Sequence, residues 1–152
     1  MKYLVDANVL SEPTRPSPAG EVVGWLAANE SELCVDSIVL GELYLGVIGL
    51  PESRRRATLE RWFQAVAKTV VCLPWDLPVG MRWAKLTAEL KRKGRPVPVL
   101  DSMIAATALV HGLTVATRNV DDFKPTGVAV VNPFGGAERS ELIGPAHSSP
   151  AR

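Results

Sequence analysis

Short apolar runs alternate with longer segments of helical periodicity through most of the chain. The short runs are continuous and rich in β-formers, as in strands that are buried on both faces of a parallel sheet. Such strands are expected at residues 3–5, 33–35, 69–73, 113–116 and 128–131. The segments between them carry apolar side chains at three- and four-residue spacing, which predicts helices. This alternation is typical of an α/β fold with a mostly parallel five-stranded sheet.

The predicted helices have recognisable ends. After a short turn at Asp6, they are expected at residues 19–29, 38–48, 51–68, 77–93 and 100–111. Ser37 is a suitable N-cap for the second of these helices. Gly94 and Gly112 follow the last two helices, where a left-handed residue commonly ends a helix. Residues 11–18 contain three prolines and are predicted to form a mobile loop over Asp6.

Length and composition fit one domain. The chain has 152 residues, of which 47% are apolar, and residues 1–133 are expected to form the domain. Residues 134–152 are rich in Gly, Ser and Pro and predict a flexible tail. No apolar run is long enough to span a bilayer, and the N-terminus shows no signal pattern. Cys34 and Cys72 lie in apolar runs, which favours buried thiols and a cytoplasmic location.

The net charge is only +1, yet the basic residues are clustered. Arg54, Arg55 and Arg56 form one cluster, and residues 91–95 form another. Clusters of this kind are usually solvated helix faces. The second one lies at the end of a predicted helix, where the helix dipole favours cations. Neither cluster alone indicates a function.

Three acidic residues stand where charge is unusual. Asp6 directly follows the first predicted strand, and Asp101 stands at the start of a helix. Both positions also suit a simple helix cap. Glu42 is the single charge in the apolar helix 38–48, which is expected to be largely buried, and a buried glutamate normally needs a partner or a metal ion. Its side chain could alternatively reach solvent from the edge of the helix.

A right-handed parallel sheet could bring these acids, with Asp121 or Asp122, to one edge. Carboxylates about 5 Å apart repel by roughly 3 kcal/mol per pair at an effective dielectric constant of 20, so several of them together require a cation. Oxygen ligands without histidine or thiolate favour Mg²⁺ or Mn²⁺. An ion of this kind can activate water toward a phosphorus atom, which suggests phosphodiester hydrolysis.

Four segments in order resemble the motifs of the PIN-domain ribonucleases, and within them the VapC-type toxins of bacterial toxin–antitoxin pairs. The opening segment 4–13 is similar to the family's D-x-N motif, and segment 41–47 is similar to its E-L-x-x-G helix. Segment 100–108 resembles the D-x-x-I-A-A-T-A motif, and segment 117–123 resembles the closing T-R-[DN]-x-x-[DE]-F element. The resemblance covers residues 1–133.

The resemblance implies a three-layer PIN fold and an endoribonuclease that uses Mg²⁺ or Mn²⁺. Asp6, Glu42 and Asp101 would bind the metal, while Asn8 and Thr117 would hydrogen-bond to these carboxylates. It also implies a homodimer, an RNA substrate and a small DNA-binding antitoxin whose tail covers the site. In this setting the basic residues Arg92, Lys93 and Arg95 are candidates for contact with RNA phosphates.

The identity of a fourth acid is open. Some family members carry an aspartate directly after T-R, where this chain has Asn119. In an extended segment Asp121 would point with Phe123, and Asp122 would point the other way. The resemblance favours Asp122, because the acid directly before Phe is the recurrent one; Asp121, or no fourth acid, remains an alternative.

Two other functions fit parts of this pattern. An aspartyl-phosphate phosphatase would use Asp6 as a nucleophile, but such enzymes want a second aspartate two residues later, where this chain has Asn8. A catalytically inactive PIN-like module that binds RNA or protein would be indicated by a missing carboxylate, and the first three are present.

Overall fold

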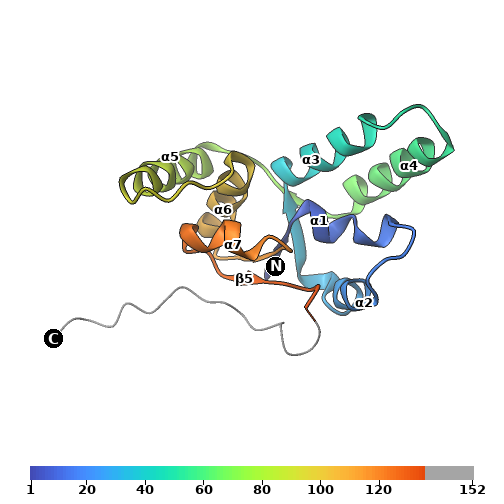
Figure 1. Cartoon of the computed structure of the whole chain (residues 1–152), viewed down its shortest axis with the longest axis horizontal. Helices are drawn as coiled ribbons and strands as arrows, with labels where there is room; N and C mark the ends of the chain where they lie inside the picture. Colours follow the sequence, from blue (N-terminus) through green and yellow to red (C-terminus); the bar gives the residue numbers. More distant parts are fainter. Residues whose placement is uncertain (136–152) are drawn as a thin grey trace.

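A five-stranded sheet in the order β3-β2-β1-β4-β5 forms the centre of the computed structural model, which describes residues 1–135 (Figure 1). The strands are β1 (Tyr3–Val5), β2 (Leu33–Asp36), β3 (Val71–Leu73), β4 (Thr114–Ala116) and β5 (Val130–Val131). All four neighbouring pairs are parallel. The predicted sheet is therefore confirmed and is wholly parallel. The predicted tail lies outside the described residues from position 136 onward.

Helices flank the sheet, which confirms the three-layer α/β fold. They are α1 (Ala7–Leu10), α2 (Gly20–Ala28), α3 (Ser37–Ile48), α4 (Arg54–Thr69), α5 (Leu77–Arg92), α6 (Val99–His111) and α7 (Val120–Phe123). Short 3₁₀ helices occupy η1 (Glu12–Thr14), η2 (Glu30–Glu32) and η3 (Lys124–Thr126). Helix α3 packs against α4, and α5 packs against α6; the α3–α4 pair and the α5–α6 pair lie toward opposite ends of the molecule (Figure 1). No helix in residues 1–135 has the length and apolar character needed to cross a membrane.

Two predicted helix ends are confirmed, and one N-cap is corrected. Gly94 and Gly112 both have left-handed backbone conformations, with φ of 62° and 64°. Helix α3, however, is capped by Asp36, whose carboxylate accepts a hydrogen bond from Val39 N at 2.9 Å. Ser37 is instead the first helical residue, because the preceding strand runs one residue further than predicted.

Two burial predictions are wrong. Helix α3 buries one face through Val39, Leu43 and Val47, but Tyr44 and Leu45 on its other face are exposed. Cys34 is fully buried, as predicted, whereas Cys72 is exposed. The reason is that β3 lies at the edge of the sheet, and an apolar run in an edge strand can be open to solvent.

The proline-rich segment after α1 is more ordered than a simple loop. Residues Glu12–Thr14 form a 3₁₀ turn, and Pro13 stands in its first positions, where a missing N–H costs nothing. The buried Glu12 carboxylate accepts from Ala19 N at 3.0 Å and pairs with Arg15 at 3.2 Å. Glu12 thus ties this segment to the start of α2.

Candidate active site

The site lies at the carboxyl end of the central strand. Strands β2 and β3 lie on one side of β1 in the sheet, and β4 and β5 lie on the other. The strand order therefore reverses at β1. Open α/β sheets bind ligands beyond the carboxyl ends of the strands at such a reversal. Asp6 is the residue that directly follows β1.

Asp6 is held rigidly and almost fully buried, with 3% of its surface exposed. One oxygen, Oδ1, accepts from Ala7 N at 2.8 Å and so caps α1, while Oδ2 accepts from Thr117 Oγ1 at 2.7 Å and from Asn8 Nδ2 at 3.3 Å. The predicted hydrogen bonds from Asn8 and Thr117 are thus confirmed. Burial raises the pKa of Asp6, and these hydrogen bonds counteract that rise. Asp6 is both a cap and a functional candidate.

Glu42 reaches the same place from α3. Its side chain is half-buried, and Oε1 is buried with no hydrogen-bond partner among the described residues. Burial, followed by repulsion from Asp6 and Asp101, raises the pKa of Glu42 to about 7. A buried oxygen without a hydrogen-bond partner costs free energy, which indicates that Oε1 of Glu42 binds a proton, a cation or a water molecule.

Asp101 completes the cluster from the first turn of α6. Pro98 occupies the N-cap position of this helix, so Asp101 is not its cap. Burial raises the pKa of Asp101 to about 6, with smaller contributions from the negative charges of Asp6 and Asp122. The structure therefore brings Asp6, Glu42 and Asp101 into one electrostatic cluster, and Asp122 lies close enough to act on Asp101.

The neighbouring residue Asp121 points away from this cluster. Its side chain is 92% exposed and pairs with Lys124 Nζ at 2.8 Å, which lowers the pKa of Asp121. Residues 120–123 form the short helix α7, so the alternation of side chains in an extended segment does not apply here. Successive side chains on a helix point about 100° apart rather than to opposite sides. Phe123 is fully buried and anchors this turn.

The sequence interpretation missed Asp36, which is fully buried next to the cluster. Its Oδ2 accepts from Thr107 Oγ1 at 2.7 Å, and its negative charge contributes to the raised pKa of Glu42. Because its oxygens are occupied by Thr107 and the N-terminus of α3, Asp36 fixes the helix that carries Glu42. The available signal was the position of Asp36 directly after a strand, the same position that singled out Asp6.

The donor atoms suit a hard divalent cation. The converging groups are all carboxylates, and burial together with neighbouring negative charge, which a cation would neutralise, raises the pKa of Glu42 and of Asp101. In the part of the chain described, no three acidic, His or Cys side chains already enclose a metal-sized space. This arrangement fits Mg²⁺, which usually keeps several waters and uses one or two carboxylates together with substrate phosphates.

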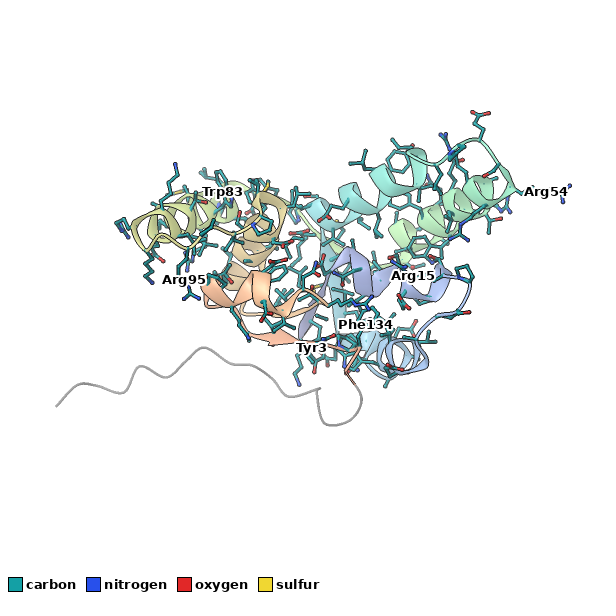
Figure 2. The ribbon with its side chains drawn as sticks, in the orientation of Figure 1. Tyr3, Arg15, Arg54, Trp83, Arg95 and Phe134 are labelled. Carbon is teal, nitrogen blue, oxygen red and sulfur yellow. The ribbon has the colours of Figure 1, made fainter. Side chains whose placement is uncertain are left out.

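The two basic clusters lie far apart. Arg54 marks the start of α4, and Arg95 marks the loop after α5, at opposite ends of the molecule (Figure 2). Arg56 forms an ion pair with Glu60 at 3.0 Å and donates a hydrogen bond to the carbonyl oxygen of Leu50 at 3.1 Å. The cluster at residues 91–95 is the one that adjoins α6, which carries Asp101.

Known proteins share this fold and much of this sequence. Residues 3–128 match the PIN domain family. The toxin FitB of Neisseria gonorrhoeae is 39% identical over 135 residues, which cover 86% of this chain and 97% of FitB. The tRNA(fMet)-specific endonuclease VapC of Shigella flexneri is 30% identical over 129 residues, covering 84% of this chain and 93% of that protein.

Solved structures agree with the sequence matches. The structure of FitAB bound to an IR36 DNA fragment aligns with a TM-score of 0.81 at 34% identity, over 87% of this chain and 95% of the matched chain. The DNA-bound VapBC of Salmonella typhimurium aligns with a TM-score of 0.75 at 26% identity, over 88% and 98% of the two chains. The chain described here therefore belongs to the PIN-domain family and, within it, to the VapC-type toxins of bacterial toxin–antitoxin pairs.

Proposed function

We propose that this protein is a Mg²⁺- or Mn²⁺-dependent endoribonuclease, with Asp6, Glu42 and Asp101 as metal-binding and catalytic residues and Asp122 as the fourth acid. The observation that carries the proposal is the convergence of carboxylates from the end of β1, from α3 and from α6, where burial, and then repulsion from neighbouring acids, raises the pKa of both Glu42 and Asp101. The names of related proteins support an RNA substrate, since they include ribonucleases and a tRNA endonuclease.

Each residue has a role that follows from its surroundings. Asp6 is fixed by three hydrogen bonds, so it offers a carboxylate in one defined position. Asp101 faces the same space from α6 and supplies the second charge. Glu42, with a pKa of about 7, can accept a proton at neutral pH, which suits a residue that orients the attacking water.

A divalent ion held by these residues would supply Lewis-acid activation of the attacking water and neutralise charge on the leaving oxygen. Asp122 is exposed, so it can approach the ion without further loss of solvation. Asp6, Asn8 and Thr117 form the rigid side of the site, while Glu42, Asp101 and Asp122 form its solvent-facing side.

We include a small DNA-binding antitoxin and a homodimer in the proposal. A cavity of about 250 Å³ runs from Glu42 to Trp62 and Leu59 between α1, α3 and α4. An antitoxin tail lying in this cavity could present an Arg or Lys to the carboxylates at its Glu42 end.

The exposed Leu77 and Met81, one turn apart on α5, offer an apolar surface for the second copy of the homodimer. An enzyme with this substrate and partner acts in the cytoplasm.

Incubation of the purified chain with labelled tRNA and rRNA in Mg²⁺, Mn²⁺ or EDTA tests the function. We expect cleavage with either metal and none with EDTA. Asp101→Asn should remove most activity while leaving the metal-free protein no less stable, since one repelling charge is lost. Metal-independent cleavage, or full activity of Asp101→Asn, would contradict the proposal.

Expression without an antitoxin should also arrest growth, and harmless expression of the folded chain would contradict the toxin role.

A further inference from the structure

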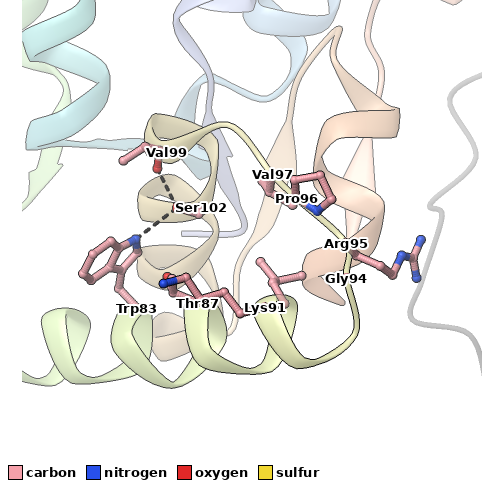
Figure 3. Close-up of a pocket in the computed structure, with 10 residues that line it drawn as sticks. Trp83, Thr87, Lys91, Gly94, Arg95, Pro96, Val97, Val99 and Ser102 are labelled. Carbon is pink, nitrogen blue, oxygen red and sulfur yellow. Dashed lines mark hydrogen bonds between the residues drawn. The ribbon is translucent and has the colours of Figure 1, made fainter.

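A second cavity, separate from the one beside Glu42, lies between the last turns of α5 and the start of α6 (Figure 3). Its volume is about 370 Å³, within the range of about 300–1,000 Å³ that small-ligand pockets occupy. Leu90, Pro96, Val97 and Trp83 are among the residues that line it. These aliphatic and aromatic side chains form an apolar slot.

One buried polar atom in this wall has no hydrogen-bond partner among the described residues. Trp83 Nε1 donates to Ser102 Oγ at 3.0 Å, and Ser102 in turn donates to the carbonyl oxygen of Val99 at 2.6 Å, so both side chains are satisfied. Thr87 Oγ1 is buried and makes no hydrogen bond to any described residue. A helical threonine ordinarily bonds to a carbonyl one turn earlier. Thr87 lines the cavity, so a ligand there would offer the hydrogen-bond partner that its buried hydroxyl lacks.

The rim of the cavity is cationic. Lys91 follows Thr87 by one helical turn, and Arg95 extends outward from the loop that follows (Figure 3). This loop turns back through Gly94, with φ of 62°, and is fixed by Arg95 N, which donates to the carbonyl oxygen of Leu90 at 3.0 Å. Neither cation forms an ion pair with an acid in residues 1–135. Two free cations beside an apolar slot match a phosphate followed by a base.

The cavity adjoins the candidate active site. Ser102 and Val99, which line it, belong to the same turn of α6 as Asp101. Asp101 directly precedes Ser102 in this helix, so the two sites lie on neighbouring faces of α6, and an RNA strand bound at the carboxylates could extend to the cavity.

We propose that this cavity binds one unstacked base of the RNA substrate, with the adjoining phosphates at Lys91 and Arg95. The inference rests on the ribonuclease function proposed above. Single-stranded RNA is commonly recognised by bases that leave the stack and lie against aromatic and apolar side chains. The hydroxyl of Thr87 can donate or accept one hydrogen bond, so it reads one edge of that base. The cavity would then set a preference at one position of the cleavage sequence.

Mapping the cleavage sites in a pool of random RNA by sequencing tests this role. Thr87→Val removes the hydroxyl and keeps the shape, and it should weaken the preference at one nucleotide position by about 2- to 10-fold, the effect of one hydrogen bond. Because the lost hydroxyl is unpaired, the melting temperature should not fall. Thr69→Val is the matched control: Thr69 is an exposed helical threonine on α4 and bonds to its own helix, so the preference should stay unchanged.

RNA binding in EDTA gives a readout that does not depend on catalysis. A short RNA should quench the fluorescence of Trp83, and Trp83→Phe should remove that part of the quenching. Lys91→Gln and Arg95→Gln should each weaken binding of every sequence and lower the salt dependence of binding by about 0.7 in slope.

The possible failures are distinguishable. If the unaltered chain cuts no RNA, the proposed function itself fails. If the chain cuts RNA, but Thr87→Val keeps the same preference and Trp83→Phe keeps the same quenching, the base-binding role is wrong while the ribonuclease function stands. A changed oligomeric state of Thr87→Val without a changed preference would also overturn the proposal, because the cavity would then be a contact with a second copy of the chain.

Discussion

Replacing Glu42 with Gln should stabilise the metal-free protein at alkaline pH. Folding raises the pKa of Glu42 from 4.5 to about 7, mainly through burial. Between these two pH values the folded state keeps a proton that the unfolded chain has lost, so stability falls as the pH rises. For full burial this rise in pKa corresponds to about 3 kcal/mol. Solvent screening of a half-buried side chain reduces the destabilisation to about 1–2 kcal/mol.

The amide keeps the size and helix propensity of glutamate but carries no charge. At pH 8 in EDTA, Glu42→Gln should therefore be about 1–2 kcal/mol more stable than the original chain, or about 3–6 °C higher in melting temperature. At pH 4.5 the difference should be small, and below that pH it should vanish, because the carboxyl group is then protonated in both the folded and the unfolded chain. Glu52→Gln, at an exposed position before α4, should show no such dependence on pH.

Urea titrations at pH 4.5 and pH 8 measure this effect. Adding Mg²⁺ at pH 8 should stabilise the original chain, by as much as about 2.7 kcal/mol at a hundredfold excess over its dissociation constant, and should stabilise Glu42→Gln less. A Glu42→Gln protein that is less stable than the original at pH 8 without metal would refute the reasoning, because it would show that the ionised carboxylate has a stabilising partner.

Four further substitutions test individual contacts. Asp122→Asn should raise the Mn²⁺ concentration for half-maximal RNA cleavage, whereas Asp121→Asn should change it little, because Asp121 already pairs with a lysine; the reverse order would exclude Asp122. Asp36→Ala should cost about 1–2 kcal/mol in urea unfolding through the lost cap of α3, and unchanged stability would contradict the capping role. Thr117→Val removes a hydrogen bond that lowers the pKa of Asp6, so Mn²⁺ binding should weaken more at pH 6 than at pH 8 in a calorimetric titration. An equal loss at both pH values would argue against this coupling.

The sheet was predictable from the sequence because each buried strand is a continuous apolar run that contrasts with the helices around it. Strand β1 and the carboxylate that follows it mark a candidate site at the end of the central strand, although Asp6 taken alone also fits a simple helix cap. The edge strand β3 shows the limit of such patterns: its apolar run resembles a buried one, yet Val71 is 50% exposed. Local sequence does not say which strand lies at the edge, since that depends on the order of the whole sheet.

The acids were predictable as a group, but their individual surroundings were not. Asp36 carries the same strand-end signal as Asp6, yet its carboxylate bonds to Thr107, a residue 71 positions later in the chain. Asp121 and Asp122 are neighbours, and only the helical turn of α7 together with Lys124 separates their roles. A contact between distant elements determines the surroundings of Asp36, and a local turn determines those of Asp121 and Asp122; hydrophobic periodicity contains no information about either.

Analysis of the RNA ends produced by the purified chain tests most directly whether its carboxylates support metal-dependent hydrolysis. Attack by an activated water on phosphorus leaves a phosphate at one end and a free hydroxyl at the other. We expect these ends in Mn²⁺, no cleavage in EDTA, and neither product from Asp6→Asn. Fragments that end in a 2′,3′-cyclic phosphate and form equally well in EDTA would show that the ribose hydroxyl is the attacking group, and would contradict a metal-dependent role for Asp6, Glu42 and Asp101.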